Sequence, residues 1–326
     1  DEVEGKKRVK GIWFEDEYKR IYPYNSLACN VIGFTSSDGS VGTGGIEQYY
    51  NSSLIGVNGR EYGYLDENSN LEGVVKPAEG GKTIVSTIDV NIQNIVQKYI
   101  NEWQTTTGSK VTAAIVMNPN NGEILAMGTS NIFDLNNPRD VSGFTQEDLF
   151  VLGKKEAAAV YRRENEGKTI TEDQVLDHFS REDVISYGQQ VAWNQIWRNF
   201  CVSDTYEPGS PSKIFTVATG LEEGVLKGNE NFECTGYLHV GDYDIKCTAW
   251  RRGGHGWLNL QESLMQSCNV AMMRIGAMIG RERFTKYQGI FGFGDKTGID
   301  LPGEADGLVY NADNIGPTDL ATNAFG

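Results

Sequence analysis

The segment between residues 81 and 129 narrows the choice of fold more than any other part of the sequence. Residues 82–89, K-T-I-V-S-T-I-D, have the β-branched content of a strand, and Asp89 at their end is a good helix N-cap. Apolar residues then recur at the spacing of one helix face: Ile92, Ile95, Val96, Tyr99, Ile100 and Trp103. This pattern predicts a strand followed directly by an amphipathic helix.

A β-hairpin is predicted after this helix. The stretches 111–118 and 123–129 are rich in strand-forming residues and flank Pro-Asn-Asn-Gly, a strong turn signal. A helix followed by an antiparallel hairpin favours an α+β fold, in which helices pack on an antiparallel sheet. The 326 residues of the chain are enough for about two domains.

The regions on either side of this segment have a different composition. Residues 1–80 are rich in Gly, Asn, Ser and Tyr, which predicts a separate β-rich module of short strands and long loops. Residues 139–200 are charged and have high helix propensity. We expect a solvated helical insertion there, packed on the main domain. A lid that faces a substrate is the alternative.

The composition excludes several kinds of partner. The chain has 29 Lys+Arg against 44 Asp+Glu, a net charge of −15. Nucleic acids and anionic lipids need a basic face, so neither is expected as the main partner. No run of the sequence approaches the roughly 18 apolar residues of a membrane span. The first ten residues also lack the apolar stretch of a signal peptide.

The cysteines and histidines do not have the spacing of a common metal site. The five cysteines, at positions 29, 201, 234, 247 and 268, contain no C-x-x-C pair, which excludes a zinc ribbon or a thioredoxin motif. The three histidines are widely separated, so no metal site is predicted. Cys234 and Cys247 flank a short segment. They are either a disulfide pair or two unrelated buried thiols.

A serine and a lysine three residues apart form the first candidate catalytic pair. Ser210 follows a Pro-Gly turn at the start of a predicted helix, and Lys213 lies one turn later on the same face. A lysine whose pKa is lowered by burial can act as the base that activates a serine nucleophile. Taken alone, the S-x-x-K spacing is a weak signal, and an N-cap serine beside a surface lysine is its simpler interpretation.

Ser267 and Asn269 form the second candidate pair, in the order S-x-N. They lie at the end of a predicted helix whose N-cap is Asn259. The serine can pass a proton, and the asparagine can hold a substrate amide. A polar pair at a helix end is the simpler interpretation of this motif alone. The two motifs together, in this order, favour one shared active site.

The two motifs together resemble the signature of penicillin-binding proteins and serine β-lactamases. Class B penicillin-binding proteins are similar over nearly the whole chain from about Gly11, and least over 139–200. R-N-F-C-V-S-D-T-Y-E-P-G-S-P-S-K resembles the segment that leads into their nucleophile. Y-K-R-I-Y-P-Y-N-S-L-A-C-N-V-I-G-F and G-G-I-E-Q-Y-Y-N look like their N-terminal non-catalytic module. Further similar stretches are T-I-D-V-N-I-Q, M-N-P-N-N-G-E-I-L-A-M and F-G-F-G-D-K-T-G-I-D-L-P-G-E.

The resemblance implies a domain organisation. Residues 81–326 would form a penicillin-binding transpeptidase domain with a lineage-specific helical insertion at about 139–200. Residues 1–80 would form a pedestal or dimerisation-like module. The family's third motif, Lys-Thr/Ser-Gly, is not expected at Lys296, because K-T-G-I-D-L-P-G-E is similar to a structural stretch upstream of the true motif. We therefore expect the third motif beyond Gly326 or on another chain, which leaves the catalytic domain incomplete here.

Proline at position 211 departs from the family pattern. Proline is tolerated in the first turn of a helix, because its missing N–H has no partner within the helix. The resemblance implies that the nucleophile's own N–H stabilises the oxyanion, and Ser210 retains this group. Acylation is therefore expected despite Pro211. Ser212 is a weaker candidate nucleophile, because it lacks the S-x-x-K spacing.

The resemblance implies a D,D-transpeptidase of peptidoglycan synthesis. Ser210 would attack the carbonyl between two D-alanines, and Lys213 would take its proton. Ser267 would pass that proton to the leaving amine, and Asn269 would hold the amide of the substrate or of a β-lactam. No metal or organic cofactor is implied. The alternatives are a D,D-carboxypeptidase or β-lactamase, a β-lactam-binding sensor, and a non-catalytic scaffold.

The resemblance also implies partners and a location. The expected partners are peptidoglycan stem peptides, β-lactam antibiotics, a membrane glycosyltransferase and proteins of cell division or elongation; nucleic acid is not expected. The expected location is the outer face of the bacterial cytoplasmic membrane. The membrane anchor would be an N-terminal helix that these residues do not include.

Overall fold

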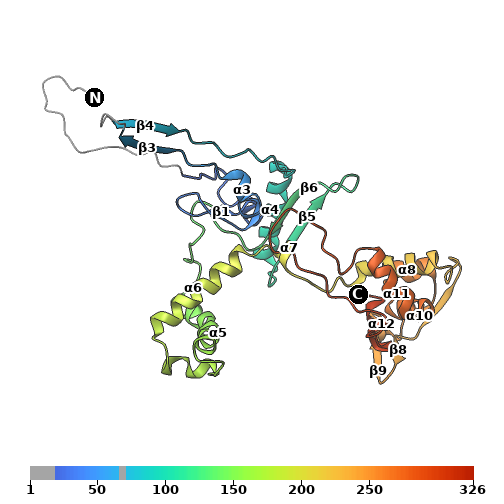
Figure 1. The fold of residues 1–326 in the computed structure, drawn as a ribbon. Helices are drawn as coiled ribbons and strands as arrows, with labels where there is room; N and C mark the ends of the chain where they lie inside the picture. The colour runs from blue at the N-terminus through green and yellow to red at the C-terminus, as the bar shows by residue number, and fades with distance from the viewer. Residues whose placement is uncertain (1–18, 66–70) are drawn as a thin grey trace. The chain divides into compact units, whose positions relative to one another are not determined.

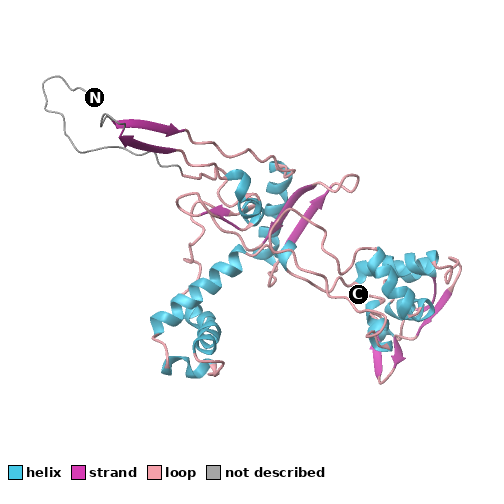
Figure 2. Ribbon diagram, in the orientation of Figure 1, coloured by secondary structure: helices cyan, strands magenta, loops and turns pink. Residues whose placement is uncertain are grey.

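The computed structural model describes residues 19–65 and 71–326. The described residues mix helices and strands (Figure 2). They divide into two units: the first runs up to Ser203 and includes Asp300–Gly303, and the second holds Asp204–Ile299 and Glu304–Gly326. Within the described residues, no helix is both long and apolar enough to cross a membrane.

The N-terminal part of the first unit combines short helices with short strands. Its elements are α1 (Cys29–Ile32), β1 (Phe34–Thr35), β2 (Gly42–Thr43), α2 (Gly45–Tyr49), α3 (Asn51–Leu54), β3 (Arg60–Leu65) and β4 (Leu71–Lys76). β1 pairs with β2, and β3 pairs with β4 in a longer antiparallel pair (Figure 1). The prediction of a β-rich module is thus only partly correct, because three helices occupy much of 29–54. Residues 11–18, where the family resemblance begins, lie outside the described residues.

Two kinds of contact hold this part together. An apolar cluster joins the N-terminal segment to residues that follow β6: Tyr22, Cys29, Phe34, Phe133 and Leu135. Beside it, the buried Glu47 carboxylate accepts a hydrogen bond from the Tyr22 hydroxyl at 3.1 Å and pairs with Arg20 at 2.9 Å. A buried carboxylate needs such partners to offset its lost hydration.

The predicted helix and hairpin in the middle of the first unit are present. They are α4 (Val90–Thr106), β5 (Ala113–Met117) and β6 (Ile124–Thr129), with β5 and β6 antiparallel. Asp89 caps α4 as predicted, and its side chain accepts from the N–H groups of Asn91 and Ile92. The buried Gln93 side chain exchanges two hydrogen bonds with the Met127 backbone, which fixes α4 on β6.

Two expectations for this segment are wrong. Residues 82–89 form no strand; they run without a paired partner strand and are tied to the hairpin through Thr87 and Asp89. The apolar stripe of α4 is also less buried than its periodicity predicts. Ile95, Tyr99 and Trp103 are 56%, 60% and 51% exposed, because the helix rests on a hairpin of only two strands.

The helical insertion at about 139–200 is confirmed as helical. It contains α5 (Gln146–Glu164), the 3-10 turn η1 (Glu172–Asp177) and α6 (Arg181–Trp197), and α7 (Phe200–Ser203) follows it. α5 and α6 lie side by side (Figure 1). Glycines allow this close contact: a Cβ added at Gly153 would lie 1.8 Å from the Val184 carbonyl oxygen, and one at Gly188 would lie 1.8 Å from that of Leu149.

The second unit is built around one buried helix. Its elements are η2 (Ser210–Ser212), α8 (Lys213–Glu222), β7 (Asn231–Cys234), β8 (Tyr237–Val240), β9 (Tyr243–Lys246), η3 (Trp250–Arg252), β10 (Gly256–Asn259), α9 (Leu260–Met265), α10 (Asn269–Ile279), α11 (Arg281–Ile290) and α12 (Pro317–Asn323). α10 contributes Val270, Met272 and Ile275 to the core, each fully buried. α8, α11 and α12 pack against it.

The strands of the second unit pair two by two. β7 pairs with β10, and β8 pairs with β9, both antiparallel. Throughout the described ranges every named sheet has two strands. The α+β class is therefore confirmed, and the described strands form separate antiparallel pairs rather than one central sheet.

Candidate active site

The Ser210 turn is shaped by a glycine before it and a proline after it. Gly209 has φ 63°, a conformation that glycine adopts without strain. Pro211 lies in the first turn of η2, which continues into α8. The Ser212 hydroxyl donates to the Gly209 carbonyl at 2.8 Å, so this second serine closes the turn. Ser210 is left exposed at the surface.

Lys213 lies beneath this exposed serine and is only 2% exposed. Its amine makes every one of its side-chain hydrogen bonds within the two predicted motifs. The Nζ atom lies 2.9 Å from Ser210 Oγ, 2.8 Å from Ser267 Oγ and 2.8 Å from Asn269 Oδ1. It also lies 3.0 Å from the Ser267 carbonyl oxygen. The structure thus brings all four predicted site residues together around one nitrogen atom.

Ser267 lies in the link between α9 and α10, and Asn269 is the first residue of α10. Asn259 caps α9 as predicted, with a reciprocal bond to Glu262. The Ser267 hydroxyl donates to Ser210 Oγ at 3.0 Å, which closes a triangle of Ser210, Lys213 and Ser267. The Asn269 amide donates to the Lys246 carbonyl at 3.4 Å. These contacts hold the two hydroxyls and the amine in proton-transfer distance of one another.

Ser267 has a strained backbone. Its φ of 49° lies in the left-handed region. This conformation costs a residue other than glycine roughly 1–2 kcal/mol. The surrounding turn holds it there, since the Ser267 N–H donates to Leu264 and the next N–H, of Cys268, donates to Ser263. Strain that is held by neighbouring contacts is common in active sites, where it directs a side chain toward the reacting atoms.

The electrostatics favour a base at Lys213. Burial lowers the pKa of the Lys213 amine below its usual range, while the nearby Cys247 and Cys268 act in the opposite direction. A neutral amine has a lone pair that can accept the Ser210 proton. The buried lysine, the exposed serine and the second hydroxyl together can therefore carry out nucleophilic acyl transfer.

The K-T-G segment at 296–298 lies in an exposed loop. Lys296 pairs with Asp306 at 3.8 Å, and the Glu304 carboxylate accepts from the N–H groups of Thr297 and Gly298. These contacts agree with the interpretation of this segment as structural.

A cavity of about 1240 Å³ in the second unit adjoins the Ser210 turn, with Pro208 and Ser212 in its wall. Aromatic side chains contribute much of its wall: Tyr206, Phe215, Phe291, Phe293, Tyr310 and Phe325. None of the four motif residues lines it. We therefore do not assign this cavity to the substrate.

Sequence reasoning missed a relationship among the cysteines. Cys234 and Cys247 are not bridged, and all five cysteines are free. They are not unrelated either, because both lie in one cluster with Cys268 and His255. The spacing of these four residues in the sequence gives no sign of this, because they come from four separate segments that only the folded structure brings together.

Comparison with known proteins identifies two matching family models. Residues 112–326 match the penicillin binding protein transpeptidase domain, and residues 2–86 match the penicillin-binding protein dimerisation domain. Stage V sporulation protein D of Bacillus subtilis is 30% identical over 98% of this chain and 42% of its own length. Peptidoglycan D,D-transpeptidase MrdA of Acinetobacter baumannii is 25% identical over 94% of this chain and 42% of its own length. The chain spans less than half the length of these two relatives.

Solved structures with a similar fold also include a penicillin-binding protein. A putative peptidoglycan glycosyltransferase from Atopobium parvulum matches with a TM-score of 0.65 and 26% identity, covering 94% of this chain and 57% of the other. Penicillin binding protein 3 from Mycobacterium tuberculosis, complexed with aztreonam, matches with a TM-score of 0.64 and 25% identity, covering 94% and 54%. The family models and the relatives match the family whose two motifs meet around Lys213 in this structure. The chain therefore belongs to the class B penicillin-binding proteins.

Proposed function

We propose that this chain carries the acylation site of a peptidoglycan D,D-transpeptidase. The proposal rests on the position of Lys213 Nζ. This atom lies within hydrogen-bond distance of Ser210 Oγ, Ser267 Oγ and Asn269 Oδ1. One buried amine in contact with an exposed serine, a second hydroxyl and an amide is an arrangement suited to forming an acyl-enzyme.

The proposed reaction has two acyl transfers. Ser210 Oγ attacks the carbonyl between two D-alanines as Lys213 takes the hydroxyl proton. The C–N bond then breaks, Ser267 passes the proton held by Lys213 to the leaving amine, and the terminal D-alanine departs. An amine of a second stem peptide attacks the ester, returns the proton to Ser210 and forms the cross-link. Asn269 holds the donor amide throughout.

β-Lactams are proposed as inhibitors of the same site. Their strained amide takes the place of the scissile amide, and Ser210 keeps the acyl group when no acceptor can remove it. A structural relative supports this proposal, because it was solved complexed with aztreonam.

Domain organisation, partners and location are further parts of the proposal. We infer a non-catalytic module up to about residue 80 and a catalytic domain from residue 81. The protein's partners would be a membrane glycosyltransferase and proteins of cell division or elongation. Its location would be the outer face of the cytoplasmic membrane. Another structural relative, from Helicobacter pylori, was solved as a complex of PBP2 with MreC, which supports a partner of that kind.

An assay with a stem pentapeptide tests the proposed function. Full-length protein is incubated with the donor peptide and an amine acceptor, and the products are separated by mass spectrometry. We expect release of D-alanine together with a cross-linked product, and loss of both in Ser210→Ala. Ser212→Ala is the matched control and is expected to retain both products. Release of D-alanine with water alone as acceptor would instead identify a carboxypeptidase.

A further inference from the structure

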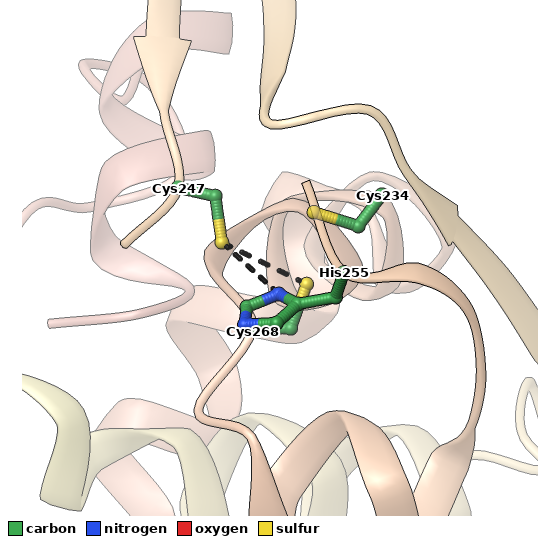
Figure 3. Close-up of side chains that lie close together, drawn as sticks. All are labelled: Cys234, Cys247, His255 and Cys268. Atoms are coloured by element: carbon green, nitrogen blue, oxygen red, sulfur yellow. Dashed lines mark hydrogen bonds between the residues drawn. The ribbon is translucent and has the colours of Figure 1, made fainter. Parts of the chain in front are cut away.

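Four side chains from separate segments of the second unit converge at the Ser267–Asn269 turn. Cys234 ends β7, Cys247 follows β9, His255 precedes β10, and Cys268 caps α10. Their ligand atoms all lie within 4.8 Å of one another. Figure 3 shows the three sulfur atoms and the imidazole ring gathered around one small space.

Two distances within this cluster match the edges of a tetrahedral zinc site, and all the ligand atoms lie within 4.8 Å of one another. Cys247 Sγ lies 3.9 Å from Cys268 Sγ and 3.6 Å from His255 Nδ1 (Figure 3). Zinc binds cysteine sulfur at about 2.3 Å and histidine nitrogen at about 2.0–2.1 Å. A tetrahedron with these bond lengths has edges of about 3.8 Å between sulfurs and about 3.6 Å between sulfur and nitrogen.

The ligand types also select the metal. Thiolate and imidazole are ligands of zinc and other transition metals, whereas magnesium and calcium bind oxygen. Three cysteines with one histidine form a set that is common in structural zinc sites.

A disulfide does not account for the cluster. The sulfurs of Cys247 and Cys268 are 3.9 Å apart. A disulfide bond is about 2.05 Å long. Any single bridge would also leave the third thiol and the imidazole without a role.

The site is closed to solvent on its cysteine side. Cys234, Cys247 and Cys268 are 1%, 2% and 0% exposed, and they belong to the main apolar cluster of the second unit. His255 is half-buried and forms the outer face. Four protein ligands fill a tetrahedral shell and leave no open position for a substrate or a reactive water. The cluster therefore fits a structural metal and not a catalytic one.

We propose that Cys234, Cys247, His255 and Cys268 bind one zinc ion that positions the S-x-N residues of the active site. Cys268 lies between Ser267 and Asn269, so its bond to zinc fixes the strained turn from the inside. Cys247 follows Lys246, whose carbonyl accepts the Asn269 amide. The ion joins both segments to β7 and β10, where Cys234 stands opposite Gly256, the neighbour of His255.

Metal content is the first test. Full-length protein with an affinity tag free of histidine is purified, and its zinc is measured by mass spectrometry of the elements. We expect about one zinc per chain. Cys234→Ser and Cys268→Ser are expected to lose it, whereas the matched control Cys201→Ser, outside the cluster, is expected to keep it.

A surface variant keeps the test decisive where the cysteine variants fail to fold. His255→Ala removes the outermost ligand and is expected to lower zinc affinity at least about tenfold. The control is His239→Ala, an exposed histidine paired with Asp244. Cobalt exchanged into the site is expected to give sulfur-to-cobalt charge-transfer bands in wild type, and weaker cobalt binding in His255→Ala.

Three results would overturn the proposal. The first is wild-type protein that contains no zinc and takes up no cobalt. The second is zinc that remains unchanged in the cysteine and histidine variants, which would show an adventitious ion. The third is an intact mass lower by two hydrogens that is restored by reductant, which would show a disulfide within the cluster.

The role of zinc in positioning Ser267 and Asn269 is tested by a separate measurement. Removal of zinc with a chelator is expected to slow acylation of Ser210 by benzylpenicillin, and added zinc is expected to restore the rate. Unchanged acylation in the zinc-free protein would contradict the positioning role. Because metal content is measured independently of acylation, failure of the proposed transpeptidase function would not be mistaken for failure of the zinc site.

Discussion

The amine of Lys213 lies 2.9 Å from the hydroxyl of Ser210, although the lysine side chain is buried and the serine is exposed. This relationship places a buried amine directly beneath an exposed hydroxyl. Burial disfavours the charged form of the amine, and its hydrogen bonds hold it in place.

Replacement of Lys213 is expected to slow acylation strongly. Lys213→Met removes the base, and Lys213→Arg replaces it with a guanidinium that stays protonated. Loss of a positioned base costs about 100- to 10,000-fold in rate. The measurement is the second-order rate constant for acylation by a fluorescent penicillin. Lys227→Met, at an exposed position, is the control and should react at the wild-type rate. A fast Lys213→Arg variant would exclude Lys213 as the base.

The acylation rate is expected to rise with pH. The reactive form has a neutral Lys213, and burial lowers the pKa of this amine, so its proton is lost at a lower pH than in an exposed lysine. The midpoint of the rate profile should therefore lie below the usual lysine pKa of about 10.4. Rates of penicillin acylation across the neutral and alkaline range test this. A midpoint at or above the ordinary lysine pKa would show that burial does not lower the pKa of the Lys213 amine.

Two substitutions at Ser267 separate its backbone strain from its hydroxyl. Both Ser267→Gly and Ser267→Ala remove the hydrogen bond to Ser210 and should slow acylation by similar factors. At φ 49°, glycine is unstrained and alanine is not. Ser267→Gly should therefore be about 1 kcal/mol more stable than Ser267→Ala, in unfolding by denaturant. Equal stability of the two variants would mean that the turn relaxes on substitution.

The contact between α5 and α6 is expected to tolerate no side chain at Gly188. An added Cβ would lie 1.8 Å from the Leu149 carbonyl oxygen. Gly188→Ala should therefore destabilise the protein by about 1–3 kcal/mol in thermal unfolding. Gly143→Ala is the control, because an added Cβ there meets no atom within 4 Å. Below the unfolding transition, acylation of Ser210 should remain at the wild-type rate in both variants.

The candidate site was largely predictable because its geometry is local. Ser210 and Lys213 share one helical turn, and a helix places residues three apart on one face. Ser267 and Asn269 likewise belong to one turn. The resemblance to a family then supplied the long-range relationship between the two pairs.

The metal cluster was not predictable in the same way. Its closest ligands along the chain, Cys247 and His255, are eight residues apart and belong to different strand ends. The separation rules for zinc motifs describe short loops, whereas this cluster depends on the pairing of β7 with β10. At α4, sequence periodicity predicted the helix correctly but overestimated how much of its apolar stripe is buried. The buried width is set by the element on which the helix packs, here the narrow β5–β6 hairpin.

The contact between Ser210 and the buried Lys213 predicts that Ser210 is the nucleophile of a penicillin-reactive site. Intact-mass spectrometry of full-length protein after incubation with benzylpenicillin tests it most directly. We predict one stable adduct with the mass of the drug in wild type, retained in Ser212→Ala and absent in Ser210→Ala. An unmodified, folded wild-type protein, or an adduct that persists in Ser210→Ala, would show that Ser210 is not the nucleophile of such a site.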